Sequence, residues 1–296
     1  MSEAVQSAKR LAYPTIPDTL RSFRGVGAST PMALTSKLDI FLGHHARART
    51  ALILFDAFRC SSTLIAAFSN GARAALIHEK GIDDEGRSLS AARGVSQALG
   101  CDVVFGGELN GAPIDGGCIG NSPLACLAAN ELTGNLLYFR STNLGRAWVE
   151  MVSAVERHQA DATIFLVSFE NAAATARHII EGEFNFFFFG SGGFFENVAF
   201  EDLALGGKVI DSLNLSIDDL DDEATSMFAS HLLARSQPYL LTQTWTARVL
   251  RAIHKYDDVH HILHPEVFPE PHKTRMKETI IGSEKIAGET VLSARK

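Results

Sequence analysis

Two acidic residues and one arginine stand out in this sequence because each lies just after a short apolar run. Asp56 and Arg59 follow residues 51–55, and Glu108 follows residues 102–105. Carboxylate oxygens are the ligands that Mg²⁺ prefers, and a guanidinium group can bind two phosphate oxygens at once. Metal-assisted phosphoryl transfer uses these groups, because the reaction needs positive charge and fixed donors around the phosphate oxygens.

Small polar residues occupy positions where helices are predicted to begin. They are Ser61, Ser62, Asn121 and Ser122. Free backbone N–H groups and the helix dipole attract phosphate at such positions. Serine also caps helices without binding a ligand, and for each serine taken alone the capping role is the commoner one. Their combination with the nearby acids and arginine favours a site for an anion and a hard cation.

The chain around these residues alternates between short apolar runs and longer amphipathic segments, which predicts an α/β fold with a mostly parallel sheet. Strands are predicted at 38–42, 51–55, 73–77, 102–105, 136–139, 163–167 and 184–189. Helices are predicted at 62–69, 88–99, 123–132, 146–155, 171–180, 198–209, 216–235 and 239–254. Several predicted strands, such as 163–167, have apolar residues at consecutive positions. This indicates burial on both faces, with helices on each side of the sheet.

Parallel strands bring their carboxyl ends to one edge of the sheet, where ligands bind in open α/β folds. Five predicted strands end in acids, hydroxyls, amides, glycines or arginine. The strand 136–139 is followed by Thr142 and Asn143, and the strand 163–167 is followed by Ser168. The sequence therefore predicts one polar pocket assembled from residues that lie far apart along the chain.

Length and composition narrow the class of protein. The chain has 296 residues, of which 46% are hydrophobic and 21% charged, and its net charge is −7. This charge argues against a duplex nucleic-acid binder, which usually has a concentrated basic face. No run approaches the ~18 apolar residues of a membrane span, and residues 1–10 lack the apolar core of a signal peptide. We therefore expect a cytoplasmic protein with reduced cysteines, a small-molecule substrate, and no nucleic-acid or membrane partner.

The domain organisation is predicted from periodicity, because no internal repeat or glycine- or proline-rich linker divides the chain. Residues 1–36 lack clear periodicity and are predicted to form an N-terminal extension. Residues 273–296 are polar and are predicted to form a C-terminal tail. The α/β catalytic domain is predicted to span residues 37–272.

Two further patterns suggest other chemistry. Five histidines cluster toward the C-terminus and suggest zinc, but no HExxH pattern supports that interpretation. These histidines are His254, His260, His261, His264 and His272. The loop 190–193 is glycine-rich, but no GxGxxG follows the first strands, so a nucleotide-dependent oxidoreductase is the least favoured function.

Five segments, in order along the chain, resemble the motifs of the 2-phosphosulfolactate phosphatases, which are enzymes of coenzyme M biosynthesis. Residues 55–63 (FDAFRCSST) resemble the family's DxxRxSTT, and residues 107–123 (GELNG…GNSP) resemble its GE…G…GNSP loop. Residues 141–143 (STN) are similar to its TTN, 168–172 (SFENA) to its SFxNA, and 201–207 (EDLALGG) to its ED…G element. The resemblance covers most of the chain except both ends.

The resemblance implies a three-layer α/β/α fold and Mg²⁺-dependent hydrolysis of 2-phospho-3-sulfolactate to 3-sulfolactate and phosphate. On the chemistry of the residues, we assign Mg²⁺ binding to Asp56, Glu108 and Asp202, and catalysis to Asp56, Arg59 and Glu108. The residues assigned to substrate binding are Ser61, Ser62, Asn121, Ser122, Thr142 and Asn143. A metal-bound water is the preferred nucleophile, covalent attack by Asp56 is the alternative, and we expect a homo-oligomer.

The sequence departs from the family's pattern at four positions. Leu109 stands where arginine is usual, and Cys118 stands near the position of an expected aspartate. Leu144 replaces a usual glycine, and the expected cysteine is missing around Gly190. These departures leave two alternatives open, namely a phosphatase with a changed substrate and a non-catalytic anion-binding protein on the same scaffold.

Overall fold

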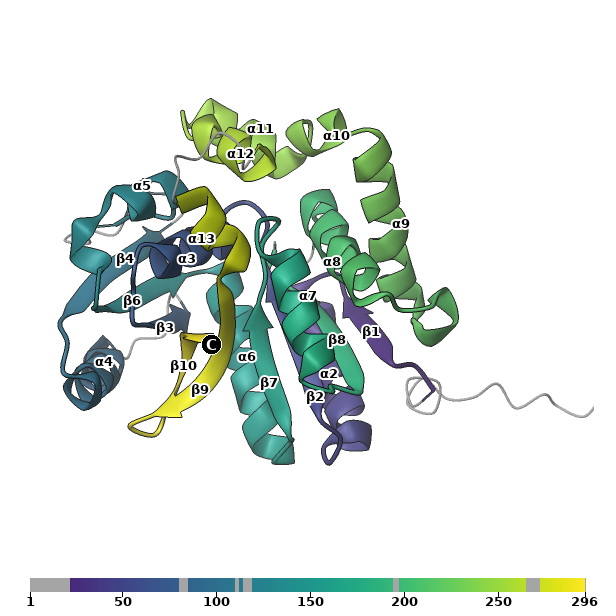
Figure 1. Cartoon of the computed structure of the whole chain (residues 1–296), viewed down its shortest axis with the longest axis horizontal. Helices are drawn as coiled ribbons and strands as arrows, with labels where there is room; N and C mark the ends of the chain where they lie inside the picture. Colours follow the sequence, from purple (N-terminus) through teal and green to yellow (C-terminus); the bar gives the residue numbers. More distant parts are fainter. Residues whose placement is uncertain are drawn as a thin grey trace, which may run out of the picture.

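The computed structural model describes residues 22–79, 85–109, 112–113, 119–193, 197–264 and 272–295. Within these residues, ten strands form one sheet in the order β1-β8-β2-β7-β9-β10-β3-β6-β4-β5 (Figure 1). In chain order the strands are β1 (Gly25–Ala28), β2 (Thr50–Phe55), β3 (Ala74–Glu79), β4 (Val103–Leu109), β5 (Ala112–Pro113), β6 (Leu136–Ser141), β7 (Ala162–Leu166), β8 (Phe186–Ser191), β9 (Ile280–Ile286) and β10 (Glu289–Arg295).

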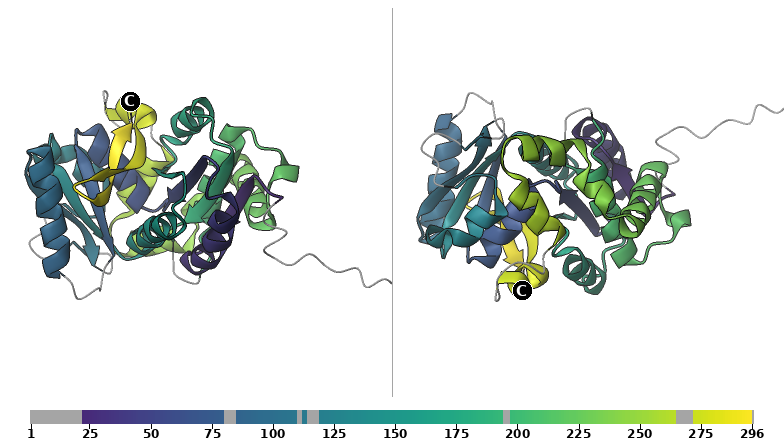
Figure 2. Two further views of the ribbon diagram at one scale, coloured as in Figure 1. Left: turned by 90° about the horizontal axis from the view of Figure 1, so that it is seen from below. Right: turned by 90° about the horizontal axis from the view of Figure 1, so that it is seen from above.

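The sheet consists of two groups of parallel strands joined by the C-terminal hairpin. Strands β1, β8, β2 and β7 form one group, and β3, β6 and β4 form the other. Strand β9 pairs antiparallel with β7, and β10 pairs antiparallel with β3, so the hairpin lies between the two groups (Figure 2). The prediction of a mostly parallel sheet is confirmed.

The prediction that residues 273–296 form a tail is wrong, because most of this segment forms the hairpin at the middle of the sheet. The two strands turn at Ala287 and Gly288, whose φ angles of 51° and 84° are those of a tight hairpin turn. The two hairpin strands contain both polar and apolar residues, so the sequence showed no clear strand pattern there. At the other end, β1 begins inside the predicted N-terminal extension, so the domain starts earlier than residue 37.

Helices cover both faces of the sheet, which confirms the three-layer α/β/α fold. In β2, Leu52 and Leu54 pack in the core with helices α2 and α6, whereas Ile53 and Phe55 pack in the core with α7, α8 and α9. The helices are α2 (Pro31–His45), α3 (Cys60–Ser69), α4 (Glu85–Leu99), α5 (Pro123–Ala128), α6 (Asn143–His158), α7 (Ala172–Glu181), α8 (Phe200–Leu213), α9 (Asp222–Ser236), α10 (Tyr239–Thr242), α11 (Trp245–Ala252), α12 (Tyr256–Leu263) and α13 (His272–Glu278). Short 3₁₀ turns lie at Asn130–Leu132 and Ile217–Asp219. Helices α10, α11 and α12 cross the top of the molecule in Figure 1.

One predicted strand is a helix. Residues 38–42 belong to α2, in which Leu34, Leu38, Phe41 and Leu42 are buried with the spacing of a helix face. The run of apolar residues looked like a strand because this helix buries neighbouring positions. The other six predicted strands are confirmed, with boundaries shifted by a few residues.

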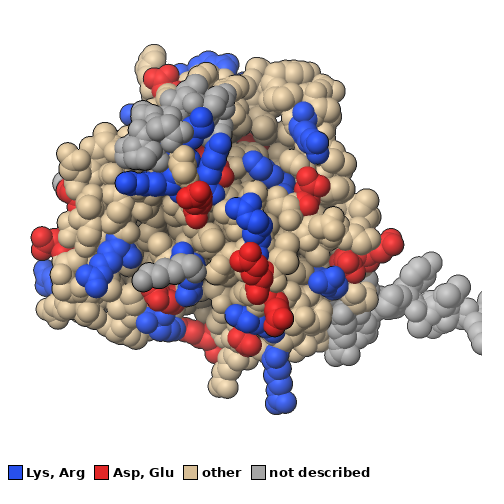
Figure 3. All heavy atoms as spheres, viewed as in Figure 1, with Lys and Arg blue, Asp and Glu red and all other residues tan. Residues whose placement is uncertain are grey.

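The surface adds two observations. On the face shown in Figure 3, basic and acidic side chains are interspersed. No helix among the described residues combines the length and the apolar character needed to cross a bilayer.

Candidate active site

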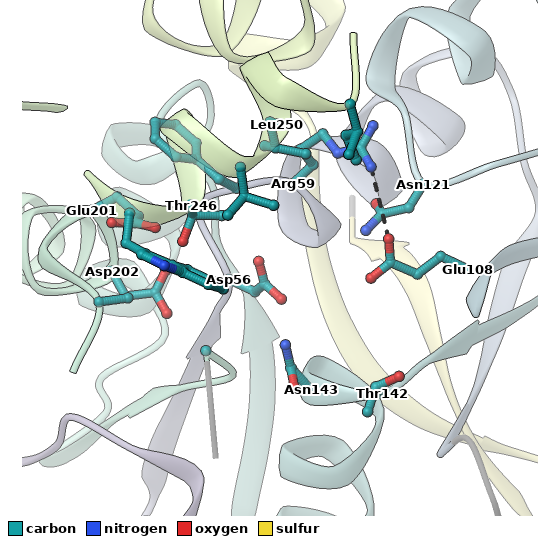
Figure 4. Close-up of a pocket in the computed structure, with 16 residues that line it drawn as sticks. Asp56, Arg59, Glu108, Asn121, Thr142, Asn143, Glu201, Asp202, Thr246 and Leu250 are labelled. Carbon is teal, nitrogen blue, oxygen red and sulfur yellow. Dashed lines mark ion pairs between the residues drawn. The ribbon is translucent and has the colours of Figure 1, made fainter. Parts of the chain in front are cut away.

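A cavity of about 380 Å³ opens at the carboxyl ends of the parallel strands, beneath helix α11 (Figure 4). Its wall is formed by Asp56, Phe58, Arg59, Glu108, Asn121, Thr142, Asn143, Gly193, Ala199, Glu201, Asp202, Trp245, Thr246, Val249, Leu250 and Ile253. Both groups of parallel strands contribute to it. Asp56 follows β2 in one group, while Glu108 lies in β4 and Thr142 follows β6 in the other.

The structure brings seven of the ten predicted site residues to this cavity. They are Asp56, Arg59, Glu108, Asn121, Thr142, Asn143 and Asp202. In Figure 4 the Asp56 carboxylate lies near the middle of the group, and the Asn143 amide points toward it. These side chains therefore lie together at one edge of the sheet, as predicted from their positions after the strands. Their roles in binding and catalysis stay predictions.

The three other predicted residues, all serines, do not line the cavity. Ser61 Oγ accepts a hydrogen bond from the backbone N–H of Asp56 (2.8 Å). Ser62 Oγ donates to Glu170 Oε2 (3.1 Å). Ser122 caps α5, because its Oγ accepts a hydrogen bond from a backbone N–H of the first turn (3.2 Å). These hydroxyls hold the turns that carry the cavity residues, and direct phosphate binding by them stays a prediction.

Asp56 and Asp202 are buried carboxyl groups, and the pKa of each is raised. Burial, and after it the charges of Asp202 and Glu108, raises the pKa of the Asp56 carboxyl well above its usual range. Asp202 accepts hydrogen bonds from the Ala57 backbone N–H (2.8 Å) and from Ser191 Oγ (2.6 Å). Burial and then the neighbouring Glu201 raise the pKa of Asp202 to about 7. Asp202 therefore joins the start of α8 to the ends of β2 and β8.

Glu201 is a fourth carboxyl group on the cavity wall that the sequence analysis did not select. It lies in the first turn of α8 beside Asp202 and is almost fully buried. Burial raises its pKa, and hydrogen bonds with the side chains of Thr246 and Thr244 oppose that rise. The segment resembling ED…G contained the signal, since both acids of the pair reach the cavity.

Arg59 is the basic side chain among the described residues of the cavity wall. Its Nη2 lies 3.7 Å from Glu108 Oε2, and its Nη1 lies 2.6 Å from Asp258 Oδ2 in α12 (Figure 4 shows the first pair).

Glycine at position 107 lets β4, which carries Glu108, pack close to β6. A Cβ at Gly107 would lie 2.0 Å from the carbonyl oxygen of Arg140, so only glycine fits there.

The acids of the cavity wall are of the chemical kind that binds a hard divalent cation. Asp56, Glu108, Glu201 and Asp202 face one cavity, and their mutual repulsion contributes to the raised pKa of Asp56. A divalent cation would relieve this repulsion, and carboxylate oxygens are what Mg²⁺ prefers. Within the described ranges, no three acid, histidine or cysteine side chains already converge closely enough to form a metal site.

Helix α11 forms a roof that the sequence did not reveal. Residues 239–254 were predicted to be a helix, but nothing in their pattern placed them over the strand ends. Trp245, Thr246, Val249 and Leu250 face the cavity from this roof. Asp258 lies beyond the last predicted helix, and its contact with Arg59 spans 199 positions along the chain.

The departures from the motif pattern fall in different places. The side chain of Leu144 is fully buried in the core with α2 and α6, and it is not part of the cavity wall. Gly190 lies within β8, where a Cβ would come within 2.4 Å of the Met151 side chain. Cys118 and the side chain of Leu109 lie outside the described residues. The two replacements that the structure describes therefore remove no polar group from the described cavity wall.

Comparisons with known proteins agree on one group of relatives. A family model described as 2-phosphosulpholactate phosphatase matches residues 41–269. A protein of Gloeobacter violaceus named "Probable 2-phosphosulfolactate phosphatase" is 26% identical over 176 residues, which cover 60% of this chain and 68% of that protein. A protein of Caldicellulosiruptor saccharolyticus with the same name is 30% identical over 185 residues, which cover 61% of this chain and 69% of that protein.

Proposed function

This chain belongs to the 2-phosphosulfolactate phosphatase family, and from that premise we propose that it hydrolyses 2-phospho-3-sulfolactate to 3-sulfolactate and phosphate in the presence of Mg²⁺. The observation that carries the proposal is the cavity at the strand ends, where several acids and Arg59 face one space. Its volume of about 380 Å³ suits a small molecule. The names of the two relatives support the same substrate.

Binding of the phosphate group is assigned to the polar side chains of the cavity wall. Arg59 donates to the phosphate oxygens, and Asn121, Thr142 and Asn143 orient the substrate through their amide and hydroxyl groups. Mg²⁺, when bound, would supply positive charge to the phosphate oxygens, and Asp56, Glu108 and Asp202 are the residues that would hold it. Helix α11 limits the access of bulk water from above, because its apolar side chains face the cavity.

The reaction breaks the bond between phosphorus and the ester oxygen, and that oxygen leaves with a proton as the hydroxyl group of 3-sulfolactate. A water molecule is the nucleophile in the preferred route, and the Asp56 carboxylate is the nucleophile in the alternative one. The two routes differ in one observable: only the second forms a phosphorylated enzyme, which rapid acid quenching of a radiolabelled substrate would trap.

The test of the proposal is phosphate release from 2-phosphosulfolactate by the purified protein with Mg²⁺. We expect Asp56→Asn to reduce kcat at least about 100-fold, because the amide binds Mg²⁺ less well than the carboxylate and cannot replace it as a nucleophile. Far-ultraviolet circular dichroism and the melting temperature should stay close to those of the wild type, since asparagine fits the same space. Unchanged turnover in Asp56→Asn would refute the role of this carboxylate.

The rival function is a binding protein that retains anions without hydrolysing them. Under that function, 2-phosphosulfolactate would raise the melting temperature and be recovered intact after incubation with Mg²⁺. The burial of Leu144 in the core favours the enzyme, because this departure takes nothing from the cavity. The cytoplasmic location and the homo-oligomer stay predictions, and light scattering of the purified protein would measure the second.

A further inference from the structure

Asp258 connects the helix that follows the roof helix α11 to Arg59 in the cavity wall. It lies in α12 and is 3% exposed. Its Oδ2 lies 2.6 Å from Arg59 Nη1, and its Oδ1 accepts a hydrogen bond from Ser122 Oγ (2.6 Å). Both carboxylate oxygens are therefore used, and they join three segments: the turn after β2, the start of α5, and α12.

The contact fixes the position of a side chain that would otherwise have several rotamers. Arg59 is also 3% exposed, and its Nη2 lies 3.7 Å from Glu108. A buried guanidinium held by a charged hydrogen bond keeps its plane and its free N–H groups in one direction. Removal of one partner from a buried pair leaves the other charge uncompensated, so Arg59 would turn toward its remaining acid.

Ser122 supports the same arrangement from the other side. Its Oγ accepts from the first turn of α5 and donates to Asp258, so its geometry is set by a helix end. The neighbouring residue, Asn121, lines the cavity, and its Oδ1 accepts a hydrogen bond from Thr63 Oγ1 (2.8 Å). The Asp258 carboxylate is thus held by the residue that caps α5, next to the cavity-wall residue Asn121.

We propose that Asp258 is a positioning residue, which holds the Arg59 guanidinium in the orientation that binds the anionic oxygens of the substrate. Anion binding then depends on the docking of α12 onto the cavity wall. The inference deepens the proposed function and rests on it for the identity of the substrate. Asp258 itself is not among the residues of the cavity wall, so in this proposal it acts through Arg59 and not on the substrate directly.

The direction in which Asp258→Asn changes the affinity for anions separates this role from the alternatives. If the Asp258 charge merely opposed the substrate, or competed with it for Arg59, Asp258→Asn would bind anions more tightly. If Asp258 positions Arg59, the same variant binds them more weakly, although a negative charge has been removed. Asp257→Asn is a matched control, because Asp257 is the preceding residue of the same helix and is exposed.

The experiment measures binding of inorganic phosphate by calorimetry with Mg²⁺ present, together with kcat and KM for 2-phosphosulfolactate. For Asp258→Asn we expect Kd and KM to rise about 10-fold or more, with a smaller change in kcat, because the variant loses a charged hydrogen bond to Arg59. For Asp257→Asn we expect both constants to stay within about 2-fold, since exposed charges contribute little. Equal or tighter phosphate binding by Asp258→Asn would overturn the proposal.

A double-mutant cycle distinguishes positioning from general structural support. If Asp258 acts through Arg59, then Asp258→Asn adds nothing to the loss of phosphate binding caused by Arg59→Gln. Additive losses would contradict the proposal, because a structural role persists without the arginine. If Asp258→Asn fails to fold, Ser122→Ala serves as the second variant. It removes the other contact of the carboxylate but keeps the charged hydrogen bond to Arg59, so we expect a smaller effect, with Kd about 2- to 5-fold weaker; an unchanged Kd would count against the proposal.

The two proposals fail in different ways. Loss of phosphate binding in Asp258→Asn, with no hydrolysis of 2-phosphosulfolactate by the wild type, would reject the proposed function and keep the positioning role. Hydrolysis by the wild type with unchanged KM in Asp258→Asn would reject the positioning role alone. A wild-type protein that neither binds phosphate nor hydrolyses 2-phosphosulfolactate would reject both.

Discussion

Glu170 is a buried carboxyl group outside the cavity wall, and it links the end of β7 to α3. Its Oε2 accepts a hydrogen bond from Ser62 Oγ (3.1 Å). Burial raises the pKa of Glu170, while hydrogen bonds and the charge of Lys208 oppose the rise. The folded protein therefore binds a proton at Glu170 more tightly than the unfolded chain does, and stability is linked to pH through this residue.

This linkage has a definite sign. Because the folded pKa is raised, the stabilisation is present in full below the unfolded value of 4.5 and is lost as pH rises through the folded pKa. Glutamine keeps the acceptor for Ser62 but does not ionise. We therefore expect Glu170→Gln to raise the free energy of unfolding, relative to the wild type, by more at pH 8 than at pH 5.

Urea unfolding at the two pH values measures the effect. Glu181→Gln is the control, because Glu181 is exposed at the end of α7 and should show the same free energy of unfolding as the wild type at both pH values. A Glu170→Gln variant whose advantage is equal at pH 5 and pH 8, or larger at pH 5, would contradict the expected linkage.

Only some residues of the candidate site could be predicted from the sequence. Asp56 and Glu108 were found because a parallel sheet brings strand ends to one edge, a rule that needs no three-dimensional coordinates. Ser61 and Ser62 satisfied the same rule, yet their hydroxyls bind neighbouring groups of the protein. Asp258 could not be found, because its partner is 199 positions away and lies in a different layer.

At the scale of the elements, helices α8 and α9 pack closely against each other where α8 has a glycine. A Cβ at Gly207 in α8 would lie 2.0 Å from the carbonyl oxygen of Met227 in α9. We expect Gly207→Ala to lower the free energy of unfolding by about 1–3 kcal/mol or more, because the added methyl group forces the two backbones apart. Chemical denaturation measures this change.

The matched control for that substitution is Gly94→Ala in α4. A Cβ at Gly94 meets no atom within 4 Å. Alanine should therefore raise the free energy of unfolding by about 0.5–1 kcal/mol, because it limits the freedom of the unfolded chain. Equal effects of the two substitutions would mean that the contact between α8 and α9 does not set the stability of this layer.

Element types were predictable where one pattern excluded the others. Residues 163–167 were correctly predicted as a strand, which is β7, because consecutive apolar residues indicate burial on both faces of a sheet. Residues 38–42 became part of α2, since a helix that buries a broad face also shows neighbouring apolar positions. Strand β1 has the sequence GVGA, and two glycines in four residues give almost no side-chain pattern to read.

At the scale of the molecule, the cavity takes its residues from both groups of parallel strands. Asp56 and Asp202 belong to the part built on β2 and β8, whereas Glu108 and Asn143 belong to the part built on β4 and β6. The hairpin β9–β10 fills the sheet between the two parts. The sequence analysis predicted one mostly parallel sheet without the antiparallel hairpin at its middle, because the hairpin strands come last in the chain and were predicted to be a polar tail.

Deletion of residues 280–296 tests whether the hairpin holds the two parts together. Its removal exposes the unpaired backbone of β7 and β3, which are buried neighbours of the hairpin in the intact sheet. It also removes Ile281 and Leu292, both fully buried. We expect the shortened chain to lose its single cooperative unfolding transition and to aggregate, as measured by calorimetry and light scattering.

Leu292→Ala is the control for the deletion, because it keeps the backbone pairing of the hairpin and removes buried side-chain volume. It should lower the free energy of unfolding by about 2–5 kcal/mol while leaving one cooperative transition. Helix α6 also packs on strands of both parts, β2 and β3. If the shortened chain stays monomeric and unfolds in one step, then α6 rather than the hairpin joins the two halves of the cavity.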